Sequence, residues 1–91
     1  MSKKVNFAMI PIKDINGNDV TIDTTKELGN LMYMQGEDLA ECELGQAIYH
    51  SGGEGPEELE LSDKQCDTIR AFAERLPYVM RTGLIEAVKP T

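Results

Sequence analysis

The sequence predicts an α+β fold, in which a β-hairpin near the N-terminus packs with about four short helices. Two observations support this prediction: an Asn-Gly pair at residues 16 and 17 separates two apolar-rich segments, and helix-start motifs follow at Thr24 and Ser62. Asn-Gly is the dipeptide that most strongly favours a tight hairpin turn. A chain of 91 residues has core for one domain, so residues 1–91 are expected to form a single small domain.

The hairpin is predicted from residues 5–12 and 19–23. Asn16-Gly17 between them is expected to form a type I′ turn, in which both central residues have positive φ. A short third strand is expected near residues 58–61, beside the hairpin, because two leucines alternate there with glutamates. The same alternation places these hairpin side chains toward the core: Val5, Phe7, Met9, Val20 and Ile22.

Four helices are predicted from capping residues and apolar periodicity. The segments starting at Thr24 and Ser62 both have the form of a capping box, a hydroxyl residue followed three positions later by Glu or Gln. Pro77 is placed at the start of the last helix, because proline is best tolerated in the first turn. The predicted helices are residues 24–34, 37–51, 62–76 and 77–88.

The first two predicted helices share a sequence repeat. Residues 27–33 and 43–49 both read Glu-Leu-Gly-(Asn/Gln)-apolar-apolar-Tyr. A glycine inside a helix costs about 1 kcal/mol relative to alanine, so a compensating contact is expected at Gly29 and Gly45. We therefore predict an antiparallel helix pair that crosses closely at these glycines. Shared packing demands are enough to explain the repeat, so it is no evidence of a duplicated binding site.

The net charge of −7 is concentrated in the middle of the chain. Residues 37–63 contain nine acidic residues and no lysine or arginine. Such a field repels phosphate groups and anionic lipids, so direct binding to nucleic acid or to a membrane is not expected. Either this segment is a solvated acidic surface, or it is a surface for a basic protein partner. The candidate partner residues are Glu54, Glu57, Glu58 and Glu60.

The sequence predicts no catalytic residue, no metal site and no cofactor. Cys42 and Cys66 fall at apolar helix positions, which is typical of reduced core thiols in a cytoplasmic protein. The single histidine, His50, lacks the close pairs of ligands that structural zinc sites use. The glycine-rich segment 52–55 lacks the lysine of a phosphate-binding loop. We therefore expect a cytoplasmic protein that is not an enzyme.

The functional prediction is a non-catalytic, intracellular protein–protein interaction module with an accessory or assembly role. The alternative is an acidic inhibitor that mimics nucleic-acid phosphates on a basic partner, of the kind that phages and mobile elements encode. Self-association as a homodimer is also expected, because the last predicted helix is apolar around most of its circumference. The residues expected to contact the second copy are Tyr78, Val79, Met80, Leu84, Ile85 and Val88.

Overall fold

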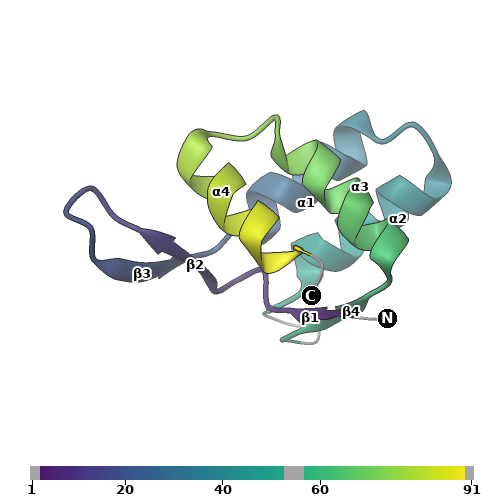
Figure 1. Cartoon of the computed structure of the whole chain (residues 1–91). Helices are drawn as coiled ribbons and strands as arrows, with labels where there is room; N and C mark the ends of the chain where they lie inside the picture. Colours follow the sequence, from purple (N-terminus) through teal and green to yellow (C-terminus); the bar gives the residue numbers. More distant parts are fainter. Residues whose placement is uncertain (1–2, 53–56, 90–91) are drawn as a thin grey trace.

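Eight strands and helices follow one another in the computed structural model, which describes residues 3–52 and 57–89 (Figure 1). The predicted α+β class is confirmed, and each predicted helix is present with its ends shifted by no more than three residues. The strands are β1 (Lys3–Val5), β2 (Ile10–Lys13), β3 (Asp19–Ile22) and β4 (Leu59–Leu61). The helices are α1 (Thr25–Gln35), α2 (Leu39–His50), α3 (Asp63–Ala73) and α4 (Tyr78–Ala87).

The strands form two separate antiparallel pairs in the described part of the chain. β2 and β3 form the predicted hairpin, with Ile10 opposite Ile22. The predicted third strand is present as β4, but it pairs with β1, where Lys4 lies opposite Glu60. The expectation that β4 extends the hairpin is therefore wrong, because the chain turns between β1 and β2 and the two strands belong to different sheets.

A turn at residues 6–9 interrupts the strand that was predicted over residues 5–12. The Asn6 Oδ1 accepts a hydrogen bond from the Ala8 N–H at 3.0 Å, and the Asn6 carbonyl oxygen accepts one from the Met9 N–H at 3.2 Å. An asparagine side chain that binds nearby backbone N–H groups competes in this way with strand pairing. Met9 points outward and is 58 % exposed, which corrects its predicted place in the core.

The start of α1 lacks the predicted capping box. The Thr24 hydroxyl donates instead to the Phe7 carbonyl oxygen at 2.7 Å, and the Thr24 N–H donates to the same oxygen at 2.8 Å. Asp23 supplies the acceptor at the helix start, because its Oδ1 binds the Thr25 hydroxyl at 2.5 Å and the Thr25 N–H at 2.9 Å. These two hydrogen bonds lower the pKa of the Asp23 carboxyl. Thr24 thus anchors α1 to the turn before β2.

The hairpin turn also differs from the predicted type I′ geometry. Gly17 has a φ of 82°, but no residue other than glycine has positive φ in the described chain. The Gly17 N–H donates to the Asp14 carbonyl oxygen at 3.0 Å, and the Asp14 Oδ1 accepts from the N–H groups of Asn16 and Asn18. This pattern fits a turn followed by a left-handed glycine, which is a common hairpin loop. The side chain of Asp14 stabilises it.

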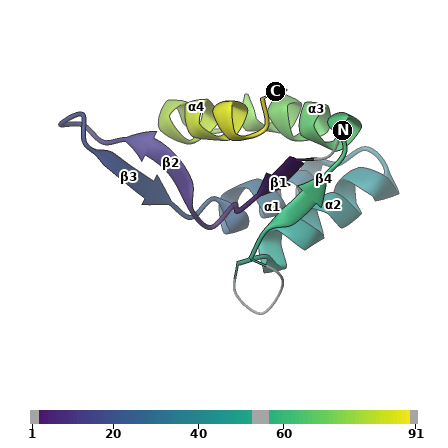
Figure 2. The same ribbon diagram turned by 60° about the horizontal axis from the view of Figure 1, so that its bottom comes forward.

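The hairpin projects from the helical body (Figures 1 and 2). Its base is covered, because Ile10 is buried and Ile12 packs against the core. Val20, opposite Ile12, is 37 % exposed, so its predicted place in the core is wrong. Ile15 near the tip is fully exposed. The distal half of the hairpin therefore lies in solvent.

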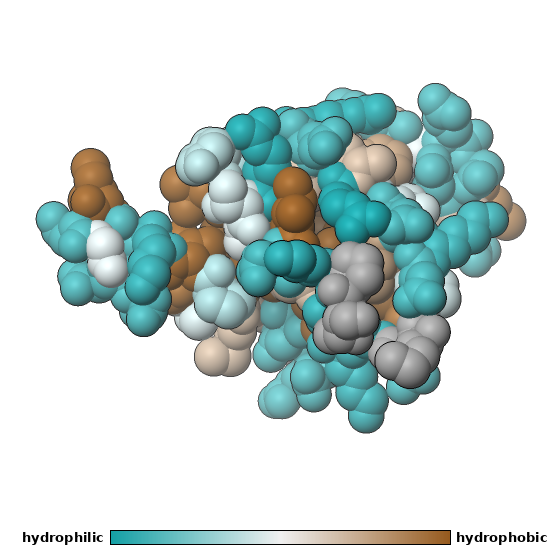
Figure 3. Space-filling model, viewed as in Figure 1, coloured by the Kyte–Doolittle hydropathy of each residue, from teal (hydrophilic) through white to brown (hydrophobic). Residues whose placement is uncertain are grey.

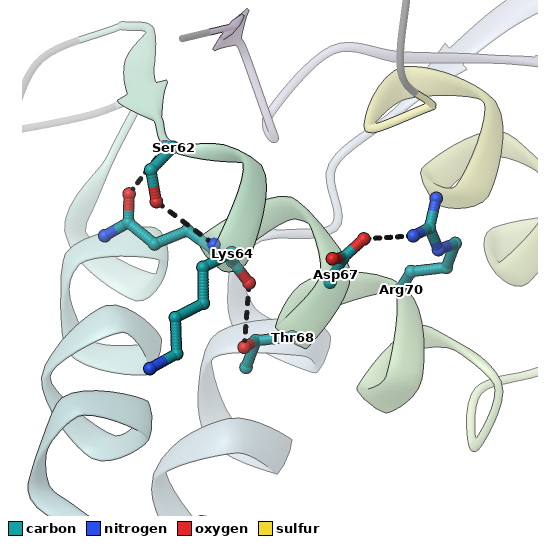
Figure 4. Close-up of polar contacts among 6 residues, drawn as sticks. Ser62, Lys64, Asp67, Thr68 and Arg70 are labelled. Atoms are coloured by element: carbon teal, nitrogen blue, oxygen red, sulfur yellow. Dashed lines mark hydrogen bonds and ion pairs between the residues drawn. The ribbon is translucent and has the colours of Figure 1, made fainter. Parts of the chain in front are cut away.

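The start of α3 has the predicted capping box (Figure 4). The Ser62 hydroxyl oxygen accepts from the Gln65 N–H at 3.2 Å, and the Gln65 Oε1 accepts from the Ser62 N–H at 2.8 Å. Arg70 forms an ion pair with Asp67 further along the helix. The apolar side of α3 faces the core, with Cys66, Ile69, Phe72 and Ala73 all buried.

The core lies between the two helix pairs. Figure 2 shows α3 and α4 on one side of the molecule and α1 and α2 on the other. α4 also packs against β2, because Gly83 allows a close approach: a Cβ there would lie 2.7 Å from Ile12 Cγ2 and 2.8 Å from Ile10 Cγ2. Side chains with no exposed surface come from all these parts: Phe7, Leu28, Met32, Ile48, Ile69, Leu84 and Val88.

Candidate functional site

The predicted acidic residues do not form one surface with the other acids of the middle segment. Glu57, Glu58 and Glu60 are exposed next to or within β4, and Glu54 lies outside the described residues. Glu60 has a basic neighbour, because it pairs with Lys4 across the β1–β4 ladder. Four of the remaining acids lie just before or near the start of α2, a helix of 12 residues that is about 18 Å long: Glu37, Asp38, Glu41 and Glu43. The fifth, Asp63, lies in the first turn of α3. The acidic segment is thus divided among the start of α2, β4 and the start of α3.

The residues predicted to self-associate divide into a buried and an exposed set. Leu84 and Val88 have no exposed surface, so they are not available to a second copy in this fold. Their burial follows from the contacts of α4 with both α3 and β2. Met80 and Ile85 are partly buried, whereas Tyr78 and Val79 are 69 % and 45 % exposed. Self-association itself stays a prediction.

α1 and α2 cross closely at their glycines, as predicted. A Cβ on Gly29 would lie 2.7 Å from the Gly45 carbonyl oxygen and from the Tyr49 Cβ. A Cβ on Gly45 would lie 2.8 Å from the Gly29 carbonyl oxygen and 2.9 Å from the Tyr33 nitrogen. Real Cβ atoms essentially never come closer than 3.0 Å to such atoms, so the crossing requires glycine at both positions.

The contacts between the two helices are reciprocal. Gly29 faces Tyr49, and Gly45 faces Tyr33. Gly45 is the repeat equivalent of Gly29, and Tyr49 is that of Tyr33. The Lys26 Nζ donates to the Tyr49 carbonyl oxygen at 3.0 Å, and the equivalent Cys42 Sγ donates to the Tyr33 carbonyl oxygen at 3.6 Å. The sequence repeat therefore corresponds to a local two-fold arrangement of α1 against α2.

A shallow cavity of about 210 Å³ lies on this helix pair. Its lining consists of His50 and three pairs of equivalent repeat residues: Gly29 with Gly45, Asn30 with Gln46, and Tyr33 with Tyr49. The glycines are buried, whereas both amides and both tyrosines are exposed. Sequence analysis found the crossing and missed the cavity. The signal for the cavity was the repetition of Asn/Gln and Tyr in both copies of the repeat, because a close crossing of the backbones requires only the glycines.

An exposed apolar and acidic surface adjoins this cavity, and we call it the α1–α2 surface. Its apolar members are Tyr33, Met34 and Leu39, which are 50 %, 71 % and 73 % exposed. Leu39 lies on the side of α2 that carries Gln46, two helical turns later. Figure 3 shows apolar atoms at the edge of the molecule where α1 meets α2, next to hydrophilic ones. The acidic members of the α1–α2 surface are Glu37, Asp38, Glu41 and Glu43.

Two of these carboxylates are already engaged with the backbone. Asp38 caps α2, because its Oδ1 accepts from the Glu41 N–H at 2.9 Å. The Glu41 Oε1 accepts from the Glu37 N–H at 2.8 Å. Arg75 is engaged at the end of α1, because it donates to the Gln35 Oε1 at 2.9 Å, and its guanidinium also lies over the ring of Phe72. The α1–α2 surface therefore keeps an excess of negative charge.

The cysteines and the histidine form no reactive cluster in the described residues. Cys66 is buried, and burial raises the pKa of its thiol, which favours the unreactive protonated form. The ring of His50 stands edge-on to Tyr49, with 5.3 Å between the ring centroids. Across residues 3–52 and 57–89, no three His, Cys, Asp or Glu side chains gather to hold a metal ion.

Comparisons with known proteins identify no relative of this chain. No protein family, curated protein or solved structure matches the chain. Within the described residues, no helix has the length and apolar character needed to cross a membrane. Function is therefore inferred from the geometry of the chain itself.

Proposed function

We propose that this chain is a non-catalytic interaction module that binds a basic, amphipathic segment of another protein on the α1–α2 surface. One observation carries the proposal: Tyr33, Met34 and Leu39 are exposed together at the end of a helix pair. A small domain of this size gains stability by burying such side chains, so their exposure favours a partner that covers them. An accessory role in the cytoplasm fits the two free thiols.

The charge of the α1–α2 surface selects the kind of partner. The α1–α2 surface includes four acidic residues, and the described chain between Lys26 and Lys64 contains no lysine or arginine. A partner with basic residues beside apolar ones would be attracted over a longer range and would pair with these carboxylates at contact. A phosphate mimic needs one continuous row of charges, and the divided acidic segment offers less support for that alternative.

The test uses a synthetic amphipathic peptide with leucines on one side and arginines on the other, measured by isothermal titration calorimetry. We expect Leu39→Asn to weaken binding several-fold, because it removes apolar contact without changing the charge. Ile15→Asn is the matched control, since Ile15 is equally apolar and fully exposed but lies on the hairpin. Equal affinities for the two variants, or no binding to the unmodified chain, would refute the proposal.

A further inference from the structure

The rings of two of the three tyrosines already carry a cation. The Lys26 Nζ lies 3.9 Å from the centroid of the Tyr49 ring, and the Arg81 Cζ lies 5.2 Å from that of Tyr78. All nine lysines and arginines lie within the described residues, and none is placed over the ring of Tyr33. Tyr33 is nevertheless half exposed, so its side chain is accessible to a cation from solution, and an aromatic ring attracts cations.

The two-fold arrangement of α1 and α2 shows where that cation would sit. Lys26 reaches Tyr49 from the opposite helix and binds its carbonyl oxygen. The residue equivalent to Lys26 is Cys42, which binds the carbonyl oxygen of Tyr33 in the same way. The short side chain of Cys42 ends at this oxygen and supplies no cation to the ring. A cation therefore occupies the position over the ring of Tyr49, and no lysine or arginine of this chain occupies the equivalent position over Tyr33.

The surroundings of Tyr33 favour a guanidinium over other cations. Glu37 lies in the connection between α1 and α2, Glu41 lies in the first turn of α2, and both supply negative charge. Asn30 and Gln46 line the same cavity, and their side-chain carbonyl oxygens can accept hydrogen bonds from a planar donor group. Arginine combines ring stacking with several N–H donors, whereas lysine offers a compact ammonium group.

We infer that Tyr33 binds an arginine side chain of the partner, in the position that Lys26 takes over Tyr49. This inference rests on the proposed function and adds the residue type that the partner must present. It also gives Cys42 a role, because a short residue at this position leaves the ring open.

The first test fills the position from within the chain. In Cys42→Lys the new ammonium group should lie over Tyr33, and its ε-methylene protons should show an upfield ring-current shift in the NMR spectrum. We expect affinity for the arginine peptide to fall about two- to fivefold, the range for an exposed cation–π contact. Glu43→Gln is the control, since it makes the same change of net charge on α2 without reaching the ring, and its loss of affinity should be smaller.

The second test varies the ring and the peptide. Tyr33→Phe should retain affinity for the arginine peptide, whereas Tyr33→Leu should lower it; a peptide with citrulline in place of arginine should not distinguish the two variants. An unshifted lysine in Cys42→Lys, or equal affinities of Tyr33→Phe and Tyr33→Leu, would overturn the inference. The proposed function would survive that result if Leu39→Asn still weakened binding. Loss of the Leu39 effect alone would instead overturn the proposed function.

Discussion

Replacing Gly45 by leucine should destabilise the protein, because the α1–α2 crossing leaves no room for a Cβ. That atom would meet the Gly29 carbonyl oxygen, the Met32 Cβ and the Tyr33 nitrogen at 2.8–2.9 Å, where ordinary contacts begin at 3.4 Å. Two of these three atoms are backbone, so the helices must part by roughly 0.5 Å or more. Overpacking costs about 1–3 kcal/mol, and we expect the upper end here. Leucine regains about 0.8 kcal/mol in helix propensity, so the net loss is about 2 kcal/mol.

Urea denaturation followed by circular dichroism measures this loss. For a domain of this size, about 2 kcal/mol also lowers the melting temperature by roughly 8–16 °C. Ala47→Leu is the matched control, because Ala47 is exposed on the same helix and the change should stay within about 0.5 kcal/mol. An unchanged or raised midpoint for Gly45→Leu would show that the two backbones are not in close contact.

Three further predictions concern single side chains. Thr24→Val should cost about 1 kcal/mol in urea denaturation, because it removes a buried hydrogen bond while keeping the shape; Thr24→Ser should cost less. The lowered pKa of Asp23 implies a contribution to stability that is present above the carboxyl's ordinary pKa of 3.8 and is lost as the pH falls through the pKa of the folded state. In Asp23→Asn the free energy of unfolding, measured by urea denaturation, should therefore depend less on pH over that acid range. Cys42 should react with iodoacetamide in the native protein, and Cys66 should react only when urea unfolds it.

The features predicted correctly from the sequence each depend on a few identifiable residues. The Ser62 capping box needs only the residue three positions later, and it forms as predicted. The crossing at Gly29 and Gly45 follows from the cost of glycine inside a helix. In both cases no distant segment competes for the residues that carry the prediction.

The errors arise where a distant segment competes for the same group. Thr24 has the sequence of a helix cap, but its hydroxyl donates to the carbonyl oxygen of Phe7, which lies 17 residues earlier in the chain. β4 has the alternation of a strand, yet alternation does not say which strand it joins, and it joins β1. Asn6 adds a local competitor, because its side chain ends β1 early. Neither the Thr24–Phe7 hydrogen bond nor the pairing of β4 with β1 can be predicted from a window of ten residues.

The α1–α2 surface is only partly visible in the sequence. Acidic residues are dense in the segment 37–63, but the fold divides the described ones among the start of α2, β4 and the start of α3. Packing alone explains the repeat's Leu, Gly and Met/Ile positions, which are buried, but not its Asn/Gln and Tyr positions, which are exposed. Its exposed Tyr33 and Tyr49 become neighbours only when the helices cross, which is a tertiary contact.

α4 offers a direct test of how its apolar residues are divided between core and surface. Leu84 is fully buried, so Leu84→Ala should cost about 2–5 kcal/mol through lost contacts and a cavity. Val79 is 45 % exposed one turn earlier, and Val79→Ala should change the free energy of unfolding by no more than about 0.5 kcal/mol. If the chain forms a homodimer through α4, Val79→Glu should give a folded monomer, because the charge would lie in the interface and not in the core. Sedimentation equilibrium of the unmodified chain and of Val79→Glu measures this. Should Val79→Glu unfold the protein, or Leu84→Ala leave its stability unchanged, α4 must be rotated about its axis relative to the packing described above.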